Sequence, residues 1–196
     1  ADDAVALVTD ANGVLPRERA PETASGLPYH STVETRNRLV VVVLSRDVRG
    51  YSGRTIDREV RQRVPDANVI YLDRGSAAGA NDDVLRAVDE EEAVVVAAVV
   101  DPEPVEAEAG AGPGDPAGRL LQTLLERAAG KTVVVAAGSP YVAESFPGIQ
   151  SYLCTFSSAA VSERSAVRAL FGEIPTRGRL PVTIPGVAAR GDGIVR

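Results

Sequence analysis

The hydrophobic residues of this chain gather in short runs of Val, Ala and Leu, and most of these runs do not alternate with polar residues. A strand that is apolar on both faces has to be covered on both faces, which is typical of parallel sheets in α/β proteins. The pattern therefore predicts about six strands in one mostly parallel sheet. The runs cover residues 4–8, 39–44, 68–72, 93–100, 132–137 and 151–156.

Helical patterns separate these runs. Ile56, Val60 and Val64 repeat every four residues and form one apolar stripe. Asp115 followed by Pro116 has the residue types that favour a helix start. The expected helices cover residues 55–64, 81–88 (with Asn81 as the cap), 115–130 and 162–171, and a short helix is expected before the last strand.

The alternation of strands and helices predicts right-handed crossovers and a three-layer α/β/α sandwich. We expect a single domain over residues 1–196, because no interdomain linker is visible. Residues 16–37 and 101–114 are rich in Pro, Gly and polar side chains and are expected to form surface loops. Residues 180–185 are expected to form an edge strand or an extended strap, and residues 191–193 a frayed end.

Composition narrows the classes of function. The net charge is −6, which argues against a nucleic-acid partner, since phosphate binding needs clustered Lys and Arg. The longest uncharged apolar run, residues 93–100, is too short to cross a bilayer, so no membrane span is expected. The sequence begins at Ala1 without an initiator Met, and we interpret it as a piece of a longer protein. The compartment of that protein stays open, an extracytoplasmic one included.

The inventory of reactive side chains is small. The only histidine, His30, lies in a loop-like stretch, so a Ser-His-Asp triad is not favoured. The only cysteine, Cys154, excludes an internal disulfide, and its apolar neighbours favour a buried hydrophobe over a nucleophile. Glycoside hydrolysis typically needs two carboxyl groups on either side of a sugar. Asp73, Asp101 and Glu103 lie near strand ends, but nothing in the sequence shows that they converge.

No cofactor and no metal are predicted. One His and one Cys cannot build a zinc site, and the Gly-rich residues 110–114 fit neither the dinucleotide nor the Walker pattern. Ser139 follows a strand, but Pro140 lacks the N–H that an oxyanion hole would use. Ser139 is therefore expected in a turn or a helix cap.

Several stretches resemble the C-terminal domain of family 3 glycoside hydrolases, in the right order along nearly the whole chain. The most specific is the closing segment, Gly-Arg-Leu-Pro-Val-Thr-Ile-Pro at 178–185. One departure is Arg17, where the family usually has Leu. The other similar stretches are the opening segment at 6–16, Gly-Ser-Pro-Tyr-Val at 138–142, Phe-Pro at 146–147, the strand at 152–157 and the helix end at 166–173.

This resemblance, which looks nearest to the bacterial β-N-acetylglucosaminidase branch, implies an accessory domain that packs on an N-terminal (β/α)8 barrel. In that branch the nucleophilic Asp and the acid/base His belong to the barrel, so no residue of this chain is assigned a catalytic role. Some relatives supply an acid/base Glu from this domain, but no Glu here lies in a matching motif. The resemblance therefore implies a fragment without activity of its own, in a parent that acts on terminal β-linked N-acetylglucosamine.

The carboxyl ends of the predicted strands are the expected place for contacts with the barrel or with carbohydrate, because ligands of open α/β sheets bind there. Arg46 is preferred among these residues, since it follows the most apolar run. Two alternatives stay open: a free-standing binding or interaction module, and a self-sufficient glycoside hydrolase. The candidate strand-end residues are Ser45, Arg46, Asp73, Asp101 and Ser139.

Overall fold

The computed structural model describes residues 1–15, 39–45, 53–90, 93–100 and 114–196, and these residues form one six-stranded sheet in the order β1-β6-β5-β4-β2-β3. The five strands from β2 to β6 run parallel, and β1 pairs antiparallel with β6 at one edge. The predicted mostly parallel sheet is confirmed. The strands are β1 (Ala6–Asp10), β2 (Leu39–Leu44), β3 (Asn68–Leu72), β4 (Ala93–Val100), β5 (Thr132–Gly138) and β6 (Ser151–Cys154).

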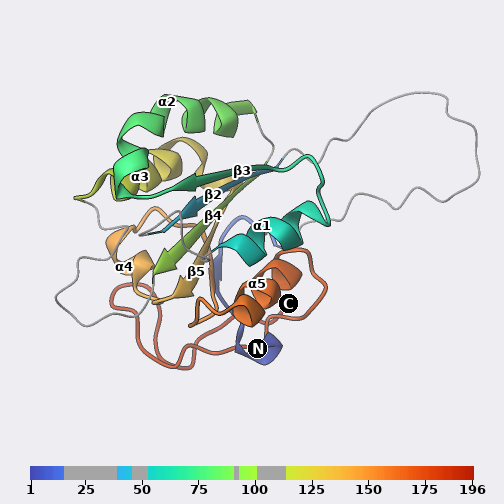
Figure 1. Cartoon of the computed structure of the whole chain (residues 1–196). Coiled ribbons are helices and arrows are strands. Elements are labelled where there is room, and N and C mark those ends of the chain that lie inside the picture. The colour runs from blue at the N-terminus through green and yellow to red at the C-terminus, as the bar shows by residue number, and fades with distance from the viewer. Residues whose placement is uncertain (16–38, 46–52, 91–92, 101–113) are drawn as a thin grey trace, which may run out of the picture.

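Helices cover both faces of the sheet, which completes the predicted α/β/α sandwich (Figure 1). Helices α1 and α5 pack together on one face, and α2 and α3 pack together on the other. A short helix, α4, lies between β5 and β6, as predicted. The helices are α1 (Arg54–Arg61), α2 (Arg74–Glu90), α3 (Pro116–Ala128), α4 (Val142–Ser145) and α5 (Ala160–Leu170), with two 3-10 turns, η1 (Asp2–Ala4) and η2 (Ala129–Lys131).

The all-apolar runs are explained by strand β2, which lies between β3 and β4. Successive side chains of a strand point to opposite faces. Val40 and Val42 join the core under α2 and α3, whereas Val41 and Val43 join the core under α1 and α5. Both faces are therefore buried, and the sequence has no reason to alternate.

Helix α2 differs from the prediction. It begins at Arg74, directly after β3, so Asn81 lies inside the helix and does not cap it. The prediction was wrong because Asp73 supplies the cap: its carboxylate accepts from the backbone N–H groups of Gly75 and Ser76. The small residues between Gly75 and Ala80 carry no apolar stripe, which concealed the first two turns.

Other element boundaries shift by a few residues. Strand β1 begins at Ala6, not at residue 4, and β6 ends at Cys154. Helix α1 ends at Arg61, and α5 begins at Ala160. The predicted start of α3 is confirmed, since the Asp115 side chain accepts from the N–H of Gly118. The loop predicted at 16–37 lies outside the described residues, as does the loop predicted at 101–114 apart from Gly114.

The C-terminal residues do not fray. The N–H of Gly191 donates to the carbonyl of Leu180 at 2.9 Å, and the N–H of Ile194 donates to Leu7 of β1 at 2.7 Å. Gly178 donates to the carbonyl of Val5, and a Cβ on Gly178 would lie 2.5 Å from that oxygen. The tail is thus held against β1, and the expectation of a frayed end at 191–193 was wrong because backbone pairing replaces side-chain packing there.

Truncation of Leu124 tests the core under α2 and α3. Leu124 is fully buried on α3, so Leu124→Ala is expected to lower the free energy of unfolding by about 2–5 kcal/mol. Urea denaturation followed by far-UV circular dichroism measures the change. The control is Gln122→Ala on the exposed side of the same helix, which should change it by no more than about 0.5 kcal/mol. Equal losses in the two variants would contradict the assigned burial.

Candidate functional site

The candidate site is the end of the sheet at which the parallel strands have their C-terminal residues, called the carboxyl edge below. Strands β2, β3 and β5 run parallel, so Ser45, Asp73 and Ser139 follow them at the same edge. Helices α1 and α2, which leave β2 and β3, cover opposite faces, so the direction of winding changes between β2 and β4. Ligands of open α/β sheets bind at such a switch point. The other candidate residues, Arg46 and Asp101, lie outside the described residues, as do Glu103 and His30.

Ser45 lies next to this switch point. Its N–H donates to the carbonyl of Leu72 at 3.0 Å, which joins the ends of β2 and β3. Its side chain is 3% exposed, and its hydroxyl has no hydrogen-bond partner among the described residues. An unsatisfied buried hydroxyl costs about 1–3 kcal/mol, so Ser45 stands out from the apolar residues before it.

Asp73 is engaged in local structure. Its Oδ1 accepts from the N–H of Gly75 at 3.0 Å and from the N–H and the hydroxyl of Ser76, both at 2.8 Å. These contacts satisfy the first donors of α2, which otherwise lack partners within the helix. The structure therefore places Asp73 at the predicted edge in the role of a helix cap.

Ser139 belongs to a turn, as the sequence predicts. Its Oγ accepts from the N–H of Tyr141 at 3.4 Å, and the hydroxyl of Tyr152 donates to the carbonyl of Pro140 at 2.7 Å. This turn presents Tyr141, whose side chain is 42% exposed, at the carboxyl edge. Tyr141 is a feature that the sequence analysis missed.

The polar groups at the carboxyl edge lie far apart. Three strand intervals of about 4.8 Å separate Asp73 from Ser139, which corresponds to about 14 Å. Ser45 and Asp73 follow the neighbouring strands β2 and β3.

Metal-binding groups do not gather in the described part of the chain, where no cluster of three or more His, Cys, Asp or Glu is found. None of the helices described there is long and apolar enough to cross a membrane. Cys154 is fully buried in β6, as the sequence predicts. Burial raises the pKa of its thiol to about 12, which removes the thiolate that a nucleophile needs.

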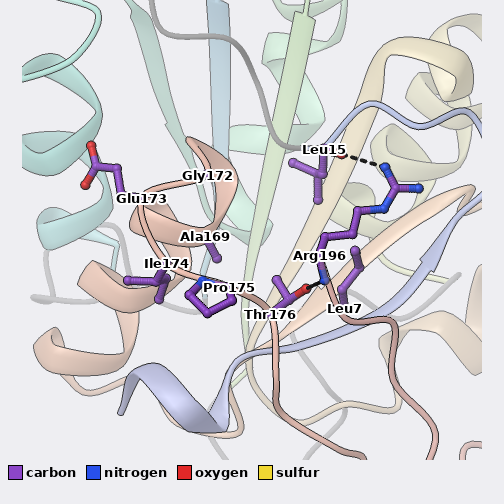
Figure 2. A pocket seen from close by; sticks show the side chains of 9 residues that line it. All are labelled: Leu7, Leu15, Ala169, Gly172, Glu173, Ile174, Pro175, Thr176 and Arg196. Atoms are coloured by element: carbon purple, nitrogen blue, oxygen red, sulfur yellow. Dashed lines mark hydrogen bonds between the residues drawn. The ribbon is translucent and has the colours of Figure 1, made fainter.

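A pocket of about 290 Å³ lies away from the carboxyl edge, between the end of α5, strand β1 and the C-terminal tail (Figure 2). Its polar side chains already have partners. The Arg196 guanidinium donates to the carbonyl of Leu15 at 2.8 Å and lies 3.2 Å from an Asp10 carboxylate oxygen. Thr176 bonds the backbone of the tail, and Glu173 pairs with Arg63. The pocket is thus an apolar hollow whose polar rim serves the fold.

An ionic network links α1 to α5. Glu59 accepts from Arg164 at 3.0 Å and from Arg63 at 3.2 Å, and Arg63 donates twice to Glu173, at 2.7 and 2.6 Å. Burial raises the pKa of Glu59, but the hydrogen bonds from Arg164 and Arg63 outweigh it and hold that pKa below its ordinary value. Hydrogen bonding to Glu173 raises the pKa of Arg63. This network stabilises the α1–α5 layer.

Two further residues escaped the sequence analysis. Glu163 is 1% exposed, and its carboxylate accepts three backbone N–H groups at the start of α1. Phe156 has a φ of 56°, the only positive φ among the described residues other than glycine. No local sequence pattern marks either residue. The contacts of Glu163, for example, lie about 110 positions away in the sequence.

No protein-family profile and no curated protein matches the sequence. Solved structures do match it. A fungal multi-domain family 3 β-N-acetylglucosaminidase aligns with 100% of this chain at 22% identity and a TM-score of 0.70. A family 3 β-N-acetylglucosaminidase from Paenibacillus sp. aligns with 92% of the chain at 13% identity and a TM-score of 0.62. A β-glucosidase from Listeria innocua aligns with 92% at 16% identity, also with a TM-score of 0.62.

This chain has the same α/β fold as a part of each of these enzymes. It spans 19% of the fungal protein, 30% of the Paenibacillus protein and 25% of the Listeria protein. At such identities the likeness establishes the fold, and what these enzymes act on is a property of those enzymes.

The burial of Cys154 can be checked with a thiol reagent. In the native protein at pH 7.5 we expect 5,5′-dithiobis-(2-nitrobenzoate) to react at least about a hundredfold more slowly than in denaturant, because the thiol is buried and protonated. The Cys154→Ser variant supplies the baseline. Rapid labelling of the folded chain would restore the nucleophile interpretation.

The ionic network predicts a pH dependence of stability. The pKa of Glu59 is lowered in the folded state, so its contribution is present above the ordinary Glu value and is lost as the pH falls below it. We expect Glu59→Gln to lose about 1 kcal/mol near pH 7, and the two proteins to converge between about pH 5 and pH 3. Urea denaturation across this range measures both curves. A constant difference down to pH 3 would show that Glu59 acts through packing.

Proposed function

We propose that this chain is the accessory α/β domain of a family 3 glycoside hydrolase whose catalytic barrel precedes it in a longer polypeptide. One observation carries the proposal: the structural alignment covers nearly all of this chain but at most 30% of each enzyme. A fold that matches only one part of a larger hydrolase supports a role as one domain of such an enzyme, although the fold alone does not fix a function.

The family-like motifs have physical roles that support the proposal. Gly172 ends α5 with a φ of 67°, a conformation that favours glycine. Gly178 lies so close to Val5 that no side chain fits. Leu180 and Ile184 of the closing segment insert into the core under α2 and α3. The residues that resemble the family are therefore those that this packing requires.

We infer that the carboxyl edge faces the barrel and its sugar site. Ser139 in its turn and the exposed ring of Tyr141 supply polar and aromatic contacts there. Ser45 lies next to the switch point, where its buried hydroxyl has no partner among the described residues. Arg46 and Asp101 follow strands β2 and β4 in the sequence and belong to the same proposal. Amphipathic Tyr is enriched at interfaces, because its ring buries area while its hydroxyl finds a partner.

In this proposal the chain itself does not catalyse hydrolysis. Asp73 caps α2, Asp115 caps α3, and Glu163 caps α1. Asp10 accepts from the N–H of Val14 and from the hydroxyl of Ser151. Each of these carboxylates already accepts hydrogen bonds from the chain itself, which supports a structural role for it.

The finer proposal is that the parent enzyme releases terminal β-linked N-acetylglucosamine. It is supported by the sequence motifs and by the two β-N-acetylglucosaminidases among the structures described above.

A direct test compares the chain alone with the chain joined to its upstream coding sequence. We expect the isolated domain to give no turnover of 4-nitrophenyl N-acetyl-β-D-glucosaminide above background, and the longer protein to turn it over at an ordinary enzymatic rate, roughly 1–1,000 s⁻¹. An upstream sequence that encodes no barrel would favour a free-standing module instead. Turnover by the isolated domain that disappears in Asp101→Asn would favour a self-sufficient hydrolase. A longer protein active only on glucosides would keep the accessory role and overturn the substrate.

A further inference from the structure

Helix α1 begins in a way that leaves it without a local cap. The N-cap residue is Gly53, which has a φ of 79° and no side chain to accept the first free N–H groups. A capping Ser or Asp does not fit, because a Cβ on Gly53 would lie 2.5 Å from Cγ1 of Val43 in β2. The close packing of Gly53 on β2 therefore leaves the start of α1 to be satisfied from elsewhere.

Glu163 fills this gap from the other helix of the layer. Its Oε1 accepts from the N–H of Gly53 at 2.7 Å, and its Oε2 accepts from the N–H groups of Thr55 and Ile56 at 3.0 and 3.3 Å. The donors of Thr55 and Ile56 are those that an N-cap side chain normally satisfies. Glu163 therefore replaces the missing N-cap side chain from a position 110 residues away.

The carboxylate of Glu163 is buried among hydrogen-bond donors. Glu163 lies in the first turn of α5, and its carboxylate reaches the start of α1. It is 1% exposed, and a buried carboxylate persists only when donors surround it. The next residue, Arg164, binds Glu59 in the second turn of α1, so adjacent residues of α5 hold both turns of this short helix.

The anchoring of Gly53 by Glu163 also concerns the carboxyl edge of the sheet. Gly53 is where the chain, having left β2 at Ser45, reaches α1, and Ser45 is itself fixed to Leu72. Gly53, at the start of α1, is fixed by its hydrogen bond to Glu163. Tyr71 adds a weaker contact, as its hydroxyl donates to the carbonyl of Gly53 at 3.3 Å.

We propose that Glu163 is a positioning residue: a built-in carboxylate ligand that occupies an anion-binding nest formed by the N–H groups of Gly53, Thr55 and Ile56. It fixes the point at which the connection from β2 joins α1. The nest binds the carboxylate group itself, so a small free carboxylate takes its place when the side chain is removed. This inference goes beyond the proposed function and does not depend on it.

The test uses Glu163→Ala and measures amide hydrogen exchange by NMR, residue by residue. We expect exchange at Gly53, Thr55 and Ile56 to accelerate about tenfold or more relative to amides of α3, because their acceptor is gone. Sodium formate should then slow exchange at these three amides in a saturable manner, whereas sodium chloride at the same ionic strength should not. The control is Glu126→Ala, an exposed carboxylate on α3, which should change none of the three amides.

Two results would overturn the proposal. One is unchanged exchange at the three amides in Glu163→Ala. The other is an acceleration that formate and chloride affect equally, which would mean that Glu163 acts through packing.

If Glu163→Ala does not fold, Glu163→Gln keeps the shape of the side chain but presents an amide NH₂ to one side of the nest. Selective loss of protection at Gly53, or at Thr55 and Ile56, is then expected. Protection equal to the wild type at all three amides would overturn the proposal.

Discussion

The two-sided burial of the central sheet is the constraint on which the rest of the structure depends. Val40 to Val43 alternate between two separate cores, so the sheet is stable only when helices cover both of its faces. That requirement dictates the pairing of α1 with α5 and of α2 with α3. It also makes the strand ends the places where polar residues follow the apolar strands, as Ser45, Asp73 and Ser139 do.

Several of the contacts that hold the helices and the tail join residues far apart in the sequence. Glu163 caps α1, Arg164 binds Glu59, and the tail bonds Leu7. The helices of the α1–α5 layer are short, with 8 and 11 residues, and isolated helices of that length are marginal in water. Their order therefore comes from the partner across the layer more than from their own sequence.

The sequence predicted the layers well because burial on both faces leaves a direct trace in the hydrophobic pattern. Asp115 with Pro116 marked the start of α3 correctly, since that cap is local. The start of α2 was misplaced because Asp73 lies before a stretch of small residues without an apolar stripe. Ser45, Asp73 and Ser139 lie at the carboxyl edge as predicted, because each directly follows a strand that the hydrophobic pattern identified. The capping role of Glu163 could not be predicted, because it depends on the close packing of Val43 against Gly53, which leaves no room for a capping side chain there.

The pairing of the C-terminal tail with β1 has a consequence for how the molecule meets other copies of itself. Strand β1 lies at one edge of the sheet, where Ile194 bonds the backbone of Leu7 and Gly178 bonds that of Val5, the residue before β1. A sheet edge with unpaired backbone groups is a template for strand addition from a second chain. The tail thus covers these groups, and a chain shortened before Gly178 would leave them open to pairing with a second copy.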